Sequence, residues 1–250
     1  MQAFIILAAG KGTRMESDLA KVLHPLCGKP LVAWVLEAAQ ALQPARIVAI
    51  VGHQADKVQS EINERHTNVE YAIQPEMLGT GHAVMQAEAP LKDFEGDVII
   101  TCGDAPLLSS ATFRALAEKR ASLDASAALL YATVPDAGSY GRVILDESST
   151  VVTKIVEAKD ASDEERACRT INAGTYCFKA SELWPFLNRI GNSNKSGEYY
   201  LTDVVGLMTE AGKKVAAVEI APREMIGVNT KAELLALETE LRAEGRCGHA

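Results

Sequence analysis

The sequence is poor in aromatic residues and has no long hydrophobic run. Phe, Trp and Tyr make up 5% of its 250 residues, and no apolar stretch reaches the ~20 residues that span a bilayer. The start of the chain also lacks a basic segment followed by a long apolar one, so we expect no secretory signal. These absences predict a cytoplasmic protein that does not act in a membrane.

Cysteine is scarce, and its spacing gives no motif. The five cysteines are scattered, and none forms a C-x-x-C pair, so we expect neither a zinc site nor a disulfide framework, and a reduced protein. The formal net charge of −8 argues against general binding to nucleic acid or to anionic membranes. Anionic substrates then need local cations, backbone amides or a metal ion.

Hydrophobic residues are plentiful, at 48% of the chain, and strand-like segments alternate with helix-like ones through the first half. We expect strands at 3–7, 46–51, 69–73 and 98–102, and helices at 31–39, 55–64, 81–89 and 109–121. This βαβ alternation predicts an α/β fold with a doubly wound, mostly parallel, Rossmann-like sheet and helices on both faces.

The second half has a more mixed pattern. We expect strands at 127–134, 141–145, 151–157, 175–178 and 215–220, the second and third of them forming a hairpin. Helices are expected at 181–188, 198–210 and 230–244. The sequence contains no internal repeat or long linker, so we expect one domain over 1–229 with two lobes that divide near residue 124, followed by a C-terminal helix and tail over 230–250.

Three polar motifs directly follow predicted strands: Ala8–Arg14, Gln74–Thr80 and Gly103–Pro106. Ligands of doubly wound sheets bind beyond the carboxyl ends of the strands, so the three motifs predict one shared site. The first is a glycine loop near two cations, Arg14 and Lys21, which suits a triphosphate. It is neither a Walker A motif nor a dinucleotide fingerprint, because G-x-x-x-x-G-K-[ST] and the third glycine of G-x-G-x-x-G are both missing.

Residues 7–24, LAAGKGTRMESDLAKVLH, resemble the signature of the sugar-1-phosphate nucleotidyltransferase family, above all its bacterial N-acetylglucosamine-1-phosphate uridylyltransferases. Further similar blocks keep the order of that family along nearly the whole chain: QPEMLGTGHA (74–83), GDAPL (103–107), YGRV (140–143), IVEAKDA (155–161), INAG (171–174), GEYYLTD (197–203) and GVN (227–229). The resemblance implies Mg²⁺-dependent transfer of UMP from UTP to N-acetylglucosamine-1-phosphate, with release of pyrophosphate. It also implies a nucleotide-binding lobe over 1–124 and a sugar-binding lobe over 125–229.

The resemblance assigns roles to individual residues. The nucleotide contacts would be Leu7, Ala8, Ala9, Gly10, Gln74, Gly79 and Thr80. The sugar contacts would be Cys102, Gly103, Gly141, Glu157 and Asn172. Arg14 and Lys21 would act on the phosphates as catalytic cations. Asp104 and Asn229 would hold the Mg²⁺, which prefers oxygen donors and takes its other ligands from water and substrate phosphates.

The chain also departs from the family pattern. Ala20 stands where proline usually precedes the lysine, which predicts a less rigid approach to Lys21. Cys102 stands where tyrosine is common, and Ser139 where glycine is frequent. Bifunctional members continue into a β-helix of hexapeptide repeats that carries an acetyltransferase. These 250 residues contain no such repeat, so β-helix-mediated trimer contacts are not expected, while the oligomeric state and whether the chain is an excised domain stay open.

Three other functions remain open from the sequence. One is a nucleotidyltransferase for a different pair, such as glucose-1-phosphate with UTP or dTTP, or a cytidylyltransferase. Another is a non-catalytic sensor of nucleotide sugars on the same scaffold. The third is an interaction module whose terminal helix, at 230–244, pairs with another chain.

Overall fold

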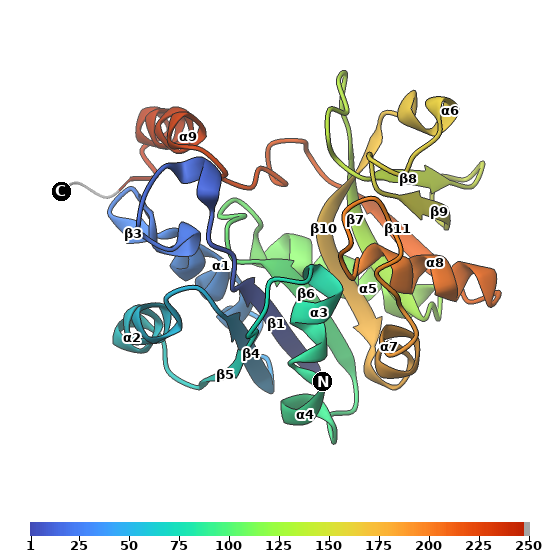
Figure 1. The fold of residues 1–250 in the computed structure, drawn as a ribbon, viewed down its shortest axis with the longest axis horizontal. Helices are drawn as coiled ribbons and strands as arrows, with labels where there is room; N and C mark the ends of the chain where they lie inside the picture. The colour runs from blue at the N-terminus through green and yellow to red at the C-terminus, as the bar shows by residue number, and fades with distance from the viewer. Residues whose placement is uncertain (248–250) are drawn as a thin grey trace.

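A nine-stranded sheet forms the centre of the computed structural model, which describes residues 1–247 (Figure 1). Its main path runs β11-β7-β10-β6-β1-β4-β5. The strands are β1 (Gln2–Ala8), β4 (Arg46–Val51), β5 (Val69–Ile73), β6 (Asp97–Cys102), β7 (Ala127–Thr133), β10 (Thr170–Lys179) and β11 (Val215–Glu219). The neighbours along this path are parallel except at β10, which is antiparallel to both β6 and β7.

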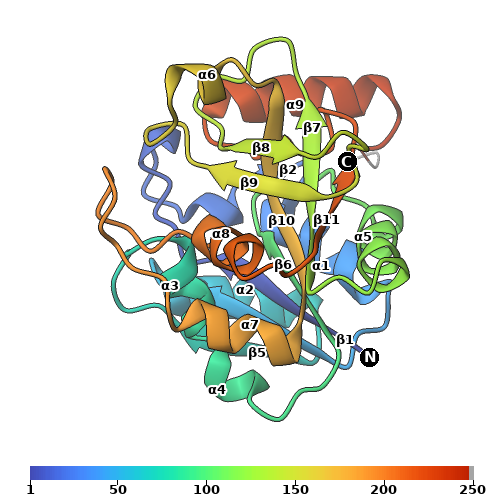
Figure 2. The same cartoon turned by 90° about the vertical axis from the view of Figure 1, so that its right-hand side faces the viewer.

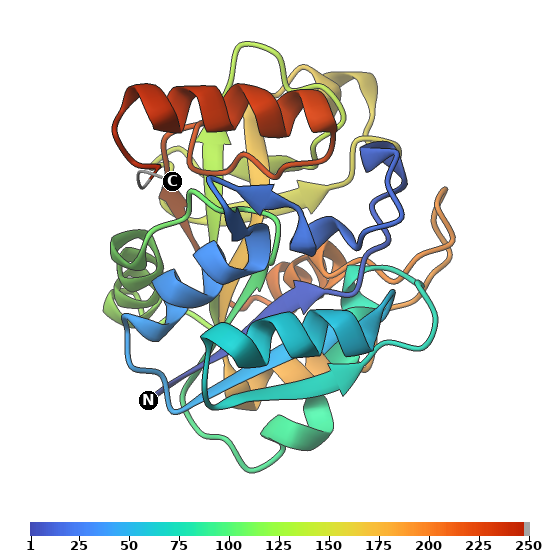
Figure 3. The same cartoon turned by 90° about the vertical axis from the view of Figure 1, so that its left-hand side faces the viewer.

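Helices cover both faces of the sheet. Figure 3 looks onto the side of α1 (Leu31–Gln40) and α2 (Ala55–Arg65), and Figure 2 onto the side of α7 (Ala180–Leu187) and α8 (Thr202–Glu210). Strand β1 explains the two layers, because successive side chains alternate between faces: Phe4 and Ile6 enter one core, and Ala3 and Ile5 the other. The predicted fold class is confirmed. In the described part of the chain, we find no helix that is both long enough and apolar enough to cross a membrane.

The expected hairpin is present as β8 (Arg142–Leu145) and β9 (Val152–Val156), which pair antiparallel. It joins the main sheet where Arg142 of β8 pairs with Ile171 of β10. The sheet also continues across residue 124, because β7 and β10 extend it from β6. The remaining short elements are η1 (Thr13–Met15), η2 (Lys21–Leu23), β2 (Pro25–Leu26), β3 (Lys29–Pro30) and α6 (Asp163–Arg166).

Several predicted bounds were wrong in ways that matter for the site. The helix expected at 81–89 is two helices, α3 (Thr80–Met85) and α4 (Glu88–Leu91). Strand β10 begins at Thr170, five residues before the expected start, and so carries Asn172. The helix expected at 198–210 begins at Thr202, because the backbone of Tyr199 is engaged elsewhere: its N–H donates to Leu78 at 2.8 Å and its carbonyl accepts from Gly81 at 2.8 Å. Helix α5 (Ser110–Ser122) is close to its expected bounds, with Ser109 as the N-cap.

The C-terminal helix α9 (Lys231–Ala243) packs on its own chain beside the segment between β1 and α1 (Figure 3). It begins with a capping box formed by Thr230 and Glu233. Leu237 and Leu241 of its apolar face are buried in a cluster with Met15 and Leu26. The face that an interaction module would offer to another chain is therefore covered from within.

The expectation of no disulfide was wrong. Cys27, in the turn between β2 and β3, is bonded to Cys247, which follows α9, and their Cα atoms lie 5.0 Å apart. The two residues are separated by 220 positions, so spacing alone gave no sign of the pair. The packing of α9 against the β2–β3 turn brings them together.

We predict that Cys247→Ser lowers the free energy of unfolding in oxidising buffer by about 2–5 kcal/mol, because a bond that closes a long loop restricts the unfolded chain. Urea unfolding with and without dithiothreitol measures this. Dithiothreitol is expected to lower wild-type stability by a similar amount and to leave Cys247→Ser unchanged. Cys168→Ser, at a free cysteine, is the control. Equal stability of the two variants in oxidising buffer contradicts the prediction.

Candidate active site

Two adjoining cavities lie where β1 and β6 end. The first, of about 300 Å³, is here called the loop-side cavity and the second, of about 250 Å³, the hairpin-side cavity. They share Cys102 and Asp104 as lining residues. The ends of β1 and β6 meet because the two strands are neighbours and run parallel, with Leu7 opposite Cys102. The predicted meeting of the motifs beyond the strands is found.

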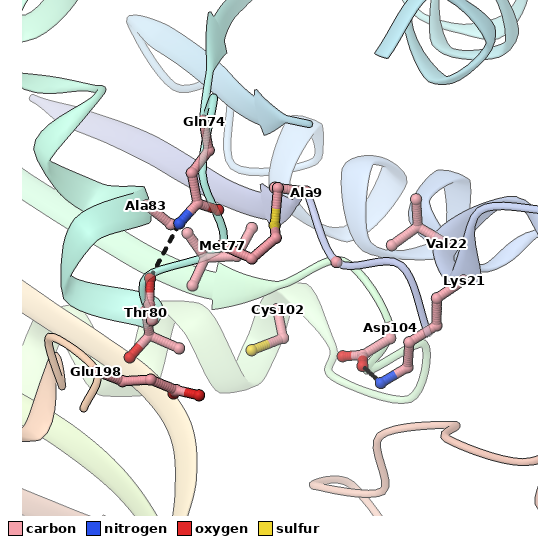
Figure 4. A pocket seen from close by; sticks show the side chains of 13 residues that line it. Ala9, Lys21, Val22, Gln74, Met77, Thr80, Ala83, Cys102, Asp104 and Glu198 are labelled. Atoms are coloured by element: carbon pink, nitrogen blue, oxygen red, sulfur yellow. Dashed lines mark hydrogen bonds and ion pairs between the residues drawn. The ribbon is translucent and has the colours of Figure 1, made fainter. Parts of the chain in front are cut away.

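The loop-side cavity contains most of the residues expected to bind nucleotide. Six of the seven line it: Leu7, Ala9, Gly10, Gln74, Gly79 and Thr80. Ala8 does not, because the alternation of β1 turns its side chain into the core, where it is 1% exposed. Met77 and Glu198 also line this cavity (Figure 4). Sequence reasoning missed both, although each stands in a block that resembles the family.

Gln74 is held in one orientation. It is 4% exposed, and its Nε2 donates to the carbonyl oxygen of Gly79 at 3.1 Å. The amide oxygen faces the other way, toward Ala9 and Met77 (Figure 4). Gly79 has a φ of +105°, and a Cβ there would stand 2.6 Å from the carbonyl oxygen of Tyr199. Only glycine fits this position without moving the backbone.

Lys21 lies between the two predicted metal ligands. Its ammonium forms an ion pair with the carboxylate of Asp104 and donates to Oδ1 of Asn229 at 2.6 Å. Arg14 donates to the same Asn229 oxygen at 2.9 Å. The amide of Asn229 is fixed from behind, since its Nδ2 donates to Gly227 at 2.7 Å. The fold thus brings together four residues that are far apart in sequence: Arg14, Lys21, Asp104 and Asn229.

The oxygens around Lys21 fit a small divalent cation. One ammonium group contacts both Asp104 and Asn229, so a single ion at that place has both oxygens within reach. Within residues 1–247 no cluster of three or more His, Cys, Asp or Glu residues has metal-site geometry. That suits Mg²⁺, which is held by one or two protein oxygens together with water and phosphate. Burial raises the pKa of the Cys102 thiol to about 12, so this neighbour stays neutral and offers no thiolate.

Glu157 and Gly141 face each other in the hairpin-side cavity. Oε1 of Glu157 accepts a hydrogen bond from the Thr202 hydroxyl at 3.1 Å, and a Cβ on Gly141 would lie 3.4 Å from Oε2 of Glu157. Burial raises the pKa of Glu157, against the effect of the Thr202 hydrogen bond, and the nearby carboxylates of Asp203, Asp160 and Glu198 raise it further. The carboxylate is therefore oriented and partly dehydrated.

Asn172 lines the same cavity and is held by two contacts. Its Nδ2 donates to the hydroxyl of Tyr176 at 2.6 Å, and its Oδ1 accepts from the N–H of Gly174 at 3.0 Å. Sequence reasoning did not connect Asn172 with Tyr176, four positions later on β10, because Asn172 was expected to lie before a strand that begins at 175. Gly103 lines neither cavity; its N–H donates to the carbonyl oxygen of Leu7 at 2.9 Å and so joins β6 to β1.

The comparisons with known proteins assign the chain to a family. A family model for the MobA-like NTP transferase domain matches residues 4–171. The chain belongs to this family. "Bifunctional protein GlmU" of Brevibacillus brevis is 46% identical over 98% of this chain and 52% of its own length. The protein of the same name from Latilactobacillus sakei is 48% identical over 92% of this chain and 49% of its own. The chain thus spans about half the length of these relatives.

A solved structure has the same fold as this NTP transferase chain. It is a UDP-glucose pyrophosphorylase complexed with UDP-glucose, with a TM-score of 0.80, 16% sequence identity, and coverage of 98% of this chain and 99% of its own. At that identity, the likeness concerns the fold alone. The family assignment and the fold match together confirm a nucleotidyltransferase scaffold.

Gly12 supports the stem of Lys21. It has a φ of +69°, and a Cβ there would lie 2.5 Å from Cβ of Lys21. Gly10, in the same loop, has no left-handed φ, and a Cβ added to it would have no neighbour within 4 Å. Of these two glycines, only Gly12 is required by the backbone conformation and by contacts within the protein. A side chain at position 10 would meet no neighbouring atom.

We predict that Gly12→Ala lowers the free energy of unfolding by about 1–3 kcal/mol, from left-handed strain and crowding against Lys21. Gly10→Ala is the matched control in the same loop and is expected to change the stability by less than about 0.5 kcal/mol. Urea unfolding monitored by circular dichroism measures both. Equal losses in the two variants contradict this account of Gly12.

Proposed function

We propose that this chain catalyses Mg²⁺-dependent transfer of UMP from UTP to N-acetylglucosamine-1-phosphate, giving UDP-N-acetylglucosamine and pyrophosphate. One observation carries the proposal: Lys21, Asp104 and Asn229 meet where the loop-side and hairpin-side cavities adjoin. A nucleotide in the first cavity and a sugar in the second would place their phosphates at this junction. The lobe at 1–124 would bind the nucleotide and the lobe at 125–229 the sugar, with α9 of the expected C-terminal segment at 230–250 as a support. Residues 248–250 of that segment lie outside the described part of the chain.

In the proposed reaction, a phosphate oxygen of the sugar phosphate attacks the α-phosphorus of UTP. A new P–O bond forms, and the bond to pyrophosphate breaks in line with it. The sugar phosphate is already ionised at neutral pH, so no general base is needed. Arg14 and Lys21 would position the phosphates and stabilise the leaving pyrophosphate. Mg²⁺ bound by Asp104 and Asn229 would supply further charge neutralisation.

The orientation of Gln74 supports a uracil base. Its Nε2 is engaged by Gly79, so the amide oxygen is the group left to meet a base. An acceptor pairs with the N3–H of uracil or thymine, whereas N3 of cytosine is itself an acceptor and only the neighbouring N4 amino group can donate. This favours UTP over CTP and argues against the cytidylyltransferase alternative.

Glu157 and Asn172 support a sugar in the hairpin-side cavity. A carboxylate and an amide that are already oriented can bind hydroxyls, and a wrong sugar would leave these groups unpaired. The choice of N-acetylglucosamine over glucose rests on the resemblance of residues 79–83 and 157–161 to the N-acetylglucosamine-1-phosphate uridylyltransferases. We also propose a cytoplasmic location, since the reaction consumes a nucleoside triphosphate.

Pyrophosphate release tests the proposal directly. The protein is incubated with each nucleoside triphosphate and a panel of sugar-1-phosphates, with and without Mg²⁺. We expect release only with UTP, N-acetylglucosamine-1-phosphate and the metal together. Release with a different pair assigns the chain to that pair, and no release with any pair favours the non-catalytic sensor.

In the same assay we predict that Lys21→Ala and Asp104→Ala each lower kcat by about a hundredfold or more, because each removes a group at the reacting phosphates. Lys11→Ala, an exposed lysine of the same loop, is the control and is expected to keep near wild-type activity. Circular dichroism checks that each variant is folded. Near-normal activity in either of the first two variants would sink the assignment.

We predict that the KM for the sugar phosphate rises as the pH falls, starting at a higher pH than an ordinary glutamate would give. The cause is the raised pKa of Glu157: the ionised carboxylate accepts sugar hydroxyls above its pKa, and protonation removes this acceptor. In Glu157→Gln, the KM at high pH is expected to be about tenfold higher and to follow only the titration of the substrate. Identical pH profiles for the two proteins would contradict the role of Glu157.

A further inference from the structure

The segment before Lys21 reaches it along the surface. Residues 16–20 lie outside helices and strands, and Glu16 and Asp18 are exposed while Ala20 is buried. Its two ends are held, because Lys231 donates to the carbonyl oxygen of Glu16 and Ala20 packs in the core. The course of the backbone between them is set by local hydrogen bonds. The 3₁₀ turn η2 starts at Lys21, so the position of that ammonium depends on how residues 16–20 are held.

The side chain of Gln54 holds this segment at two points. Its Nε2 donates to the carbonyl oxygen of Asp18 at 2.7 Å, and its Oε1 accepts from the N–H of Ala20 at 3.0 Å. Both ends of one amide are thus used by residues that precede Lys21 directly. An amide that bridges two backbone groups in this way restricts both the position and the direction of the chain.

The backbone that carries Gln54 is itself fixed to the glycine loop. Gln54 precedes α2 and has a left-handed φ of 52°. The N–H of the preceding residue, His53, donates to the carbonyl oxygen of Ala9 at 3.0 Å. A Cβ on Gly52 would lie 3.0 Å from Cβ of Ala9, so this turn packs closely on the loop. Gln54 therefore links the nucleotide loop to the segment that leads to Lys21.

We propose that Gln54 is a positioning residue that sets the place of Lys21 for turnover. This inference rests on the proposed function, in which Lys21 acts on the phosphates. It also gives a reason for alanine rather than proline at position 20. Proline would stiffen the approach to Lys21 through its ring, whereas Ala20 supplies an N–H that Gln54 binds from outside.

A proline at position 20 and the hydrogen bond from Ala20 to Gln54 cannot be present together. Ala20 has a φ of −53°, which a proline ring accepts. Proline has no N–H to donate, however, and its Cδ would occupy the space of the hydrogen that now points at Oε1 of Gln54. Ala20→Pro therefore clashes with Gln54, while shortening Gln54 to alanine makes room for the ring. We expect residues 16–20 to be rigid when either Gln54 or a proline at position 20 is present alone. We expect them to be less rigid when both are present or both are absent.

A double-mutant cycle tests the proposal: Gln54→Ala, Ala20→Pro and the double variant. Gln59→Ala, on α2, is the matched control, because the described structure gives the Gln59 side chain no hydrogen bond to residues 16–20. Two quantities are measured on each protein. One is hydrogen–deuterium exchange of the peptide that covers residues 16–23, and the other is kcat and KM for UTP by pyrophosphate release.

We expect Gln54→Ala and Ala20→Pro each to speed exchange of that peptide and to lower kcat/KM by about tenfold or more, as misplaced catalytic groups do. The double variant is expected to return to within about threefold of wild type in both quantities, so the two changes couple strongly. Gln59→Ala is expected to match wild type. Restoration in the double variant is the outcome that a merely destabilising change at either site would not give.

Three results overturn the proposal. In the first, Gln54→Ala has the same hydrogen–deuterium exchange and the same kcat/KM as Gln59→Ala. In the second, Gln54→Ala changes the exchange of residues 16–23 but not kcat/KM. In the third, the losses of kcat/KM in the two single variants multiply in the double variant. Failure of the proposed function looks different, since the wild-type protein would then release no pyrophosphate with any pair. If the wild type is active and any of the three results is obtained, the positioning role of Gln54 is rejected and the proposed function is kept.

Discussion

The contact of the Lys21 ammonium with the oxygens of Asp104 and Asn229 is the interaction on which the site depends. It joins three segments that meet only in the folded chain. Two of them are delivered by the sheet, because β1 and β6 are parallel neighbours and the segments after them emerge at the same edge. The third is delivered by α9, whose N-cap, Thr230, directly follows Asn229. The chemistry is thus placed by one pair of strands and one helix.

Packing of helix α9 brings the C-terminal part of the chain to a site formed mainly by the N-terminal part. Leu237 and Leu241 are buried against Met15, the neighbour of Arg14, and each buried leucine is worth about 1.5–3 kcal/mol. Lys231 donates to the carbonyl oxygen of Glu16 at 2.8 Å. The bond between Cys27 and Cys247 closes the far end of the same contact. Packing that stabilises the fold therefore also holds Arg14 and Asn229 together.

The sequence was informative wherever structure follows from local periodicity. The strands at 46–51 and 69–73 agree residue for residue, because short segments rich in β-branched and aromatic residues and bounded by polar ones need little else to define them. Placing motifs after strand ends was enough to predict that the glycine loop, the segment after β5 and the segment that carries Asp104 share one site. The Cys27–Cys247 bond, the docking of α9 and the two hydrogen bonds of Gln54 could not be predicted. Each depends on residues brought together by tertiary packing, and none has a spacing or composition that marks it. The side chain of Ala8 lies in the core and not in the cavity, because a motif match takes no account of the alternation of the strand.

The charges around the two cavities bear on why the proposed reaction includes a metal ion. Lys21 lines the loop-side cavity and Arg14 contacts Asn229, but the acidic residues Asp104, Glu198 and Glu157 also line the two cavities. Lys21 is moreover already paired with Asp104, so a bound triphosphate would find little uncompensated positive charge. A chain with a net charge of −8 offers no general attraction in its place. A divalent cation at Asp104 and Asn229 would turn those oxygens from a repulsive surface into ligands and leave Lys21 and Arg14 free for the phosphates. Without a metal ion, the carboxylate of Asp104 disfavours the binding of a triphosphate. With the ion bound to it, the same carboxylate would favour the binding of nucleotide and metal together.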